Sequence, residues 1–141
     1  MKSDALLADY RKAVGEFAEA LAQTPSTRLE KAGCIQYFEF CFELAWKTIK
    51  SMAEAQGMNE VPSPRGALKS AFALAWIEDE VLWLEMLEAR NRMAHTYDSV
   101  TALAVYDRFR AFLPAFQALT ARLAEALSDS KGANPEGATG A

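Results

Sequence analysis

The sequence predicts an all-α protein, an antiparallel up-and-down four-helix bundle with an additional short helix. Apolar residues recur at helical rather than alternating spacing along most of the 141 residues, and no convincing strand, coiled-coil heptad or internal repeat interrupts this pattern. Hydrophobic residues make up 51% of the chain and aromatic residues 11%, which is enough for a real core. We therefore expect one helical domain over residues 1–127.

The first two helices are predicted on either side of a short break. Apolar positions repeat helically over residues 3–23, and the segment 24–27 ends this helix, with Ser26 or Thr27 able to cap the next one. The second helix reaches about Gln56. Its centre, residues 35–50, is apolar around much of its circumference, so we expect it to be the buried, central helix.

The remaining helices are placed by their caps and by proline. After Gly57, Ser63 is a suitable N-cap for a short helix over residues 64–76, and Asp79 caps a fourth helix that ends in the segment 90–98. A fifth helix runs from residue 98 or 99 to 127, and we expect Pro114 to kink or divide it. The tail, residues 128–141, is rich in Gly, Ala and Pro and is predicted to be disordered.

Composition narrows the range of functions. The net charge of −4 and the pI near 5.1 argue against a general nucleic-acid-coating surface, so any RNA contact must be local or shared between subunits. No leader pattern and no long apolar run occurs, which predicts a soluble, cytoplasmic protein without membrane contact.

Cys34 and Cys41 are seven residues apart in one helix and are expected to be core thiols. One His and two such Cys residues predict neither a metal site nor a cofactor.

The segment 90–98 carries the residues best suited to chemistry. It combines Arg90, Asn91, His95 and Tyr97, and His95 is the only histidine of the chain. An imidazole transfers protons near neutral pH and an arginine binds phosphate, so this combination points to phosphate chemistry on RNA or a nucleotide. The alternative is structural: the basic residues, with Arg92, complement the helix dipole while the Tyr97 ring packs on the bundle.

Helix geometry divides this segment. On an unbroken helix Asn91 and His95 share one face, whereas Arg90 and His95 diverge by about 140°. Either the helix loosens near Ala94, or a second copy of the chain completes the site. We favour the second interpretation, because a two-fold homodimer brings the same patch of both subunits together.

The pattern formed by Arg90, Asn91, His95 and Tyr97 resembles the Arg-x4-His-x-Tyr signature of HepT-like proteins of the HEPN superfamily, also called nucleotidyltransferase substrate-binding proteins. Residues 35–48, 63–65 and 82–87 resemble the same family, in the same order and at similar spacing. The resemblance covers roughly residues 5–125. It implies an antiparallel four-helix bundle that dimerises and is paired with a small nucleotidyltransferase, often as a toxin–antitoxin system.

The resemblance implies a metal-independent, toxin-type ribonuclease with a composite dimeric site. His95 is then the general acid or base, Arg90 stabilises the phosphorane, and Asn91 orients the imidazole or binds a phosphate oxygen. Tyr97 is expected to accept AMP from the partner nucleotidyltransferase. Further phosphate-binding candidates are Lys47, Arg65 and Arg92.

The alternative function is not enzymatic. In this second hypothesis the chain is a nucleotidyltransferase substrate-binding subunit that binds nucleotide or presents a substrate to its partner. The sequence leaves both functions open.

Overall fold

The computed structural model of the chain describes residues 2–95 and 99–139, and the side chains of all of these except residues 94, 95, 99 and 131–139. In this part of the chain every regular element is an α-helix. The six helices are α1 (Lys2–Ala22), α2 (Arg28–Ala55), α3 (Pro64–Ala73), α4 (Glu80–His95), α5 (Ser99–Tyr106) and α6 (Phe109–Thr139).

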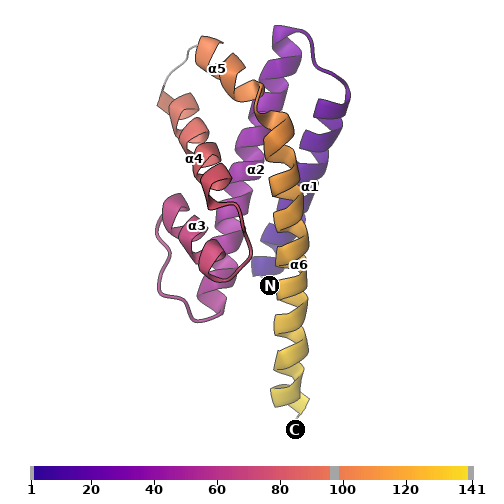
Figure 1. Ribbon diagram of the computed structural model, residues 1–141. Coiled ribbons are helices and arrows are strands. Elements are labelled where there is room, and N and C mark those ends of the chain that lie inside the picture. Colours follow the sequence, from indigo (N-terminus) through magenta and orange to yellow (C-terminus); the bar gives the residue numbers. More distant parts are fainter. Residues whose placement is uncertain (1, 96–98, 140–141) are drawn as a thin grey trace.

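The four longer helices form an antiparallel up-and-down bundle. Helix α1 rises, α2 descends, α4 rises and α6 descends again, while α3 packs at the lower end and α5 lies at the upper end (Figure 1). Helix α2 contacts each of the other five helices. The predicted fold class and the central position of the second helix are therefore confirmed.

Capping side chains set where the helices begin. Thr27 Oγ1 accepts the backbone N–H of Glu30 at 3.1 Å, and a carboxylate oxygen of Glu30 accepts the N–H of Thr27 at 2.9 Å. Ser63 caps α3 through the N–H of Gly66, and Asp79 accepts from the first turn of α4. These caps confirm the predicted starts of α2, α3 and α4, and identify Thr27 rather than Ser26 as the N-cap.

The predicted position of the break in the fifth helix was wrong. The chain divides at a turn at residues 107–108, between α5 and α6, and not at Pro114, which lies on the exposed side of α6. The proline removes one backbone hydrogen bond, but the burial of Phe109, Phe112 and Phe116 on the opposite side stabilises the continuous helix. Helix α6 extends to Thr139, and its last turns project past the other helices (Figure 1). The disorder predicted for the tail stays a prediction. A domain boundary at residue 127 stays a prediction.

An aromatic cluster fills the core. The ring of Phe38 on α2 lies 5.1 Å from that of Phe109 and 5.5 Å from that of Phe112, centroid to centroid. Trp83 on α4 meets the ring of Phe116 edge-on at 5.5 Å. Because these contacts join α2, α4 and α6, the central packing fixes where α4 stands against α2.

Two arginines hold α4 near its start and at its middle. Arg108 binds Glu85 through two bonds, of 2.6 and 2.9 Å, and Arg122 on α6 donates to the carbonyl of Ala75 at 2.8 Å and to Glu78 at 2.7 Å. Helix α4 is thus fixed in position independently of its last turns. Among the described residues, no helix has both the length and the apolar character needed to cross a membrane.

Candidate functional site

Arg90 lies in the last turns of α4 and reaches across to α2. Its Nη2 atom is 3.0 Å from Oε2 of Glu43, in the middle of α2. The side chains are 32% and 35% exposed, so the pair is accessible at the surface but not fully solvated. The helix packing described above therefore places the predicted phosphate-binding arginine against a carboxylate of a neighbouring helix.

Glu43 receives two further donors from its own helix. The indole N–H of Trp46 donates to Oε2 at 3.0 Å, and Nζ of Lys47 lies 3.5 Å from Oε1. Spacings of three and four residues place all three side chains on one face of α2. We refer to Glu43, Trp46, Lys47 and Arg90 as the Glu43 cluster.

Asn91 is next to Arg90 and exposed. Its Oδ1 atom accepts a hydrogen bond of 3.3 Å from Nη1 of Arg90. The two terminal nitrogens of the guanidinium are therefore directed differently, Nη2 toward Glu43 and Nη1 toward Asn91. A phosphate that binds Arg90 has to take the place of one of these acceptors or approach another edge of the guanidinium.

The two other signature residues are at the edge of the described structure. Helix α4 stays helical up to and including His95, so the structure does not show a helix that loosens near Ala94, which was the less favoured of the two alternatives. Positions 90 and 95 consequently stand about 140° apart around the helix axis. The His95 side chain and the whole of Tyr97 lie outside the described residues, and their assigned roles stay predictions.

The structure separates the three other phosphate-binding candidates. Lys47 shares Glu43 with Arg90. Arg92 instead binds Glu88, one turn back on the exposed face of α4, at 2.6 Å. Arg65 is exposed in the first turn of α3. Only Lys47 is thus brought together with Arg90 by a common partner in the described part of the chain.

Sequence reasoning missed Glu43 and Trp46. Both lie in a stretch read as apolar core, in which Glu43 is followed at spacings of three and four by a tryptophan and a lysine. A carboxylate and a lysine one turn apart on an otherwise apolar helix were the available signal, but their link to Arg90 is 47 residues distant along the chain.

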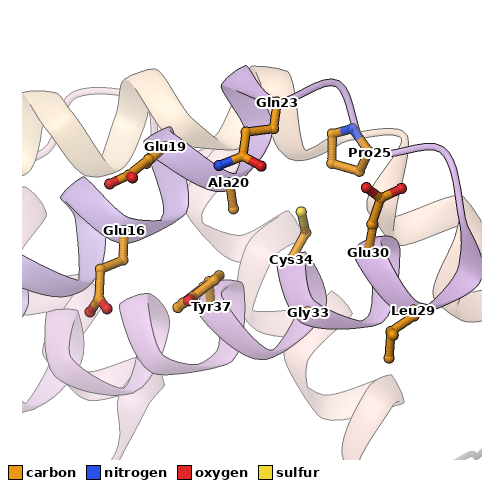
Figure 2. A pocket seen from close by; sticks show the side chains of 10 residues that line it. All are labelled: Glu16, Glu19, Ala20, Gln23, Pro25, Leu29, Glu30, Gly33, Cys34 and Tyr37. Carbon is orange, nitrogen blue, oxygen red and sulfur yellow. The ribbon is translucent and has the colours of Figure 1, made fainter.

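A separate pocket lies between the C-terminal end of α1 and the N-terminal end of α2, with a volume of about 360 Å³ (Figure 2). Glu16, Glu19 and Glu30 belong to its lining, so it is unsuited to a phosphate group. Cys34 also lines it, and burial raises the pKa of this thiol. Within the described residues, no group of three or more His, Cys, Asp or Glu side chains is placed to hold a metal ion.

Fold and site together define a small helical-bundle protein with a polar cluster of mixed charge between two antiparallel helices. The family model described as "nucleotidyltransferase substrate binding protein like" matches residues 6–125, and the chain belongs to this family. The resemblance identified from the sequence is therefore confirmed.

Individual relatives are similar over different shares of their length. The chain is 34% identical over 86 residues to a probable ribonuclease HepT from Haemophilus influenzae, an alignment that spans 58% of this chain and 59% of that protein. A crystal structure of a protein from Thermus thermophilus superposes with a TM-score of 0.73 at 27% identity, covering 81% of this chain and 98% of that one.

HI0074 from Haemophilus influenzae superposes with a TM-score of 0.62 at 25% identity, covering 86% of this chain and 96% of that one. That structure is described as the fold of a substrate-binding domain of a nucleotidyltransferase.

Proposed function

We propose that this chain is the HepT-like component of a two-protein nucleotidyltransferase system and acts as a metal-independent, toxin-type endoribonuclease. The observation that carries the proposal is the position of Arg90, held partly exposed between α2 and α4 within five residues of the only histidine. The similarity to a probable ribonuclease HepT supports it.

The chemistry requires proton transfer at two oxygens. The ribose 2′-hydroxyl attacks the adjacent phosphorus as a base takes its proton, and the bond from phosphorus to the 5′ oxygen breaks as an acid protonates that oxygen. A cyclic phosphate and a 5′-hydroxyl result. We assign the proton transfers to His95, the stabilisation of the phosphorane to Arg90, and binding of a phosphate oxygen or of the imidazole to Asn91.

A homodimer supplies what one chain lacks. Each chain has one histidine, and about 140° separates positions 90 and 95 around α4. A two-fold axis near the end of α4 places Arg90 of each subunit beside His95 of the other, in two equivalent sites. Lys47, next to Arg90 through Glu43, then adds positive charge for the RNA backbone.

Cleavage of cellular RNA in EDTA tests the activity. We expect the purified protein to cleave, and the variants Arg90→Ala and His95→Ala to lose about 10²- to 10⁴-fold in rate. Arg11→Ala, on the exposed face of α1, removes an equal charge far from the signature and serves as the control. Equal rates for all four proteins would rule out the assigned roles.

Control by the partner is the second part of the proposal. The phenolic oxygen of Tyr97 attacks the α-phosphorus of ATP bound to the nucleotidyltransferase, and pyrophosphate leaves. The attached AMP places a bulky anion close to Arg90 and His95 and excludes RNA. Co-expression with the neighbouring nucleotidyltransferase should add the mass of AMP to the peptide that contains Tyr97, and no increment should appear in Tyr97→Phe.

A non-catalytic role is the second candidate, and the description of HI0074 as a substrate-binding domain favours it. In this case the chain binds nucleotide or presents a substrate to the nucleotidyltransferase. Nucleotide binding that depends on Arg90, combined with intact RNA after prolonged incubation, would support this role over the ribonuclease.

A further inference from the structure

Glu43 stands at the centre of the Glu43 cluster and has no role in the function proposed above. Its Oε2 atom accepts from both Trp46 and Arg90 at 3.0 Å, and its Oε1 atom faces Lys47 at 3.5 Å. Donors from two helices thus converge on one half-buried carboxylate. Such an arrangement restricts the carboxylate to one orientation and, through it, the guanidinium of Arg90.

Trp46 makes this orientation specific. Its indole N–H is a neutral donor one helical turn from Glu43, and it binds the same oxygen as Arg90. Because the indole is partly buried against the core, it is less free to move than the lysine, which is 50% exposed. Trp46 therefore fixes Glu43, and Glu43 in turn fixes Arg90.

The pair between Glu43 and Arg90 is not needed to hold α4 in place. Core packing already holds this helix, because Trp83 meets the ring of Phe116 and Met86 and Leu87 are buried. Partly exposed ion pairs contribute little to folding stability. The main effect of Glu43 is therefore on where the guanidinium of Arg90 points.

Glu43 also has an electrostatic effect, which opposes the binding of an anion at Arg90. Its negative charge lies 3.0 Å from Arg90 and offsets one of the two positive charges of the cluster. A phosphate approaching Arg90 is repelled by this carboxylate, so binding of an anion is weaker than it would be beside Arg90 and Lys47 alone.

We propose that Glu43 is the positioning residue for Arg90: it orients the guanidinium toward the scissile phosphate and, in doing so, weakens ground-state binding of the anion. The proposal rests on the ribonuclease function proposed above. It predicts that removing the charge of Glu43 changes binding and turnover in opposite directions, which a purely structural ion pair does not do.

The test compares kcat and KM for RNA cleavage in three variants. Glu43→Gln should lower kcat tenfold or more, because Arg90 is no longer held, and should also lower KM roughly 3- to 10-fold, because the repulsion is removed. Trp46→Phe keeps the charge but loses the donor, so it should lower kcat without lowering KM. Glu85→Gln is the matched control, since it breaks an interhelical pair with Arg108 at a similar exposure of 39%, and it should leave both constants unchanged.

Unchanged kcat and KM in Glu43→Gln would overturn the proposal, and so would a parallel loss in Glu85→Gln.

An inactive wild-type protein would instead rule out the ribonuclease function, and two other measurements then test the role of Glu43. One is the affinity for a short RNA that carries a 2′-deoxy sugar at the cleavage position, expected to be 3- to 10-fold tighter in Glu43→Gln. The other is the Nε–H signal of Arg90 in ¹⁵N NMR, expected to broaden or exchange faster in Glu43→Gln and to stay as in the wild type in Glu85→Gln. No change in either measurement would refute the positioning role.

Discussion

Tyr10 is completely buried between α1 and α6, and its hydroxyl donates to the carbonyl oxygen of Phe116 at 2.7 Å. Burial, which disfavours the phenolate, raises the pKa of Tyr10 well above its ordinary value. Tyr10→Phe should lower the free energy of unfolding by about 1 kcal/mol, measured by urea denaturation, because this bond is lost while Thr120 still donates to the same carbonyl.

Tyr106→Phe is the comparison for this change. Its hydroxyl donates to the carbonyl of Pro25 over 3.4 Å in a partly buried place, so its removal should have the smaller effect. A larger loss for Tyr106→Phe than for Tyr10→Phe would contradict this ranking.

Glu30 provides a prediction about pH. Backbone N–H groups of Thr27 and Ser26, together with the Thr27 hydroxyl, lower the pKa of Glu30 from 4.5 to about 2. Because the folded-state pKa is the lower one, the stabilising contribution of Glu30 is complete above pH 4.5 and is lost as the pH falls through about 2.

Glu30→Gln can keep the capping bonds, since its amide oxygen accepts the same N–H groups, but it removes the titration. We expect the variant to be less stable than the wild type at pH 7, where the carboxylate contributes fully, and its unfolding free energy to decline less steeply between pH 4.5 and 2. The same slope in both proteins would argue against the lowered pKa.

The structural roles of some residues can be predicted from the sequence, and those of others cannot. Thr27, Ser63 and Asp79 were predicted from their position before helical runs, because capping bonds span only three residues. Glu43 was not, because its role depends on a guanidinium 47 residues away on another helix. Local chemistry can be read from local sequence, whereas a contact between helices requires their packing.

At the scale of the elements, two glycine substitutions test the backbone conformation within α1 and after α2. An added Cβ at Gly15, inside α1, meets no atom within 4 Å, so Gly15→Ala should stabilise the protein by roughly 0.5–1 kcal/mol, measured as a rise in Tm. Gly57, after α2, has a φ of +90°. Gly57→Ala should lower Tm, because a side chain is strained there. Changes of the same sign in both variants would contradict this assignment.

The division between α5 and α6 shows the limit of element prediction. Pro114 is the strongest helix breaker in the region, yet the turn lies at residues 107–108. At this point Tyr106 contacts the α1–α2 connection through Pro25, and its ring lies edge-on to Phe109 at 5.6 Å. The change of direction is set by packing at the end of the bundle, which residue propensities do not record.

At the scale of the whole molecule, the composite dimer makes a quantitative prediction. Mixing Arg90→Ala and His95→Ala subunits gives heterodimers in which one site has lost both residues and the other keeps both. Random exchange should therefore restore roughly a quarter of the wild-type rate of RNA cleavage, from two proteins that are inactive alone. No recovery after verified subunit exchange would indicate that Arg90 and His95 of the same subunit work together.

The sequence sufficed for the fold class and for the order of the four long helices, since these depend on apolar periodicity and caps. It placed Arg90, Asn91 and His95 at the end of one helix, but the continuity of α4 to His95 was required to show how far apart positions 90 and 95 lie. The surroundings of Arg90 came only from the structure.

The bundle topology has a practical consequence for surface-based measurements. The start of α1 and the end of α6 lie toward the lower end of the bundle in Figure 1, while α4 ends toward the upper end. An affinity tag or biotin linker at either terminus is thus remote from the last turns of α4. The protein can be immobilised on a biosensor first through one terminus and then through the other. If RNA binds at Arg90, its affinity should be the same in both orientations, whereas adsorption near the linker should depend on which terminus is attached.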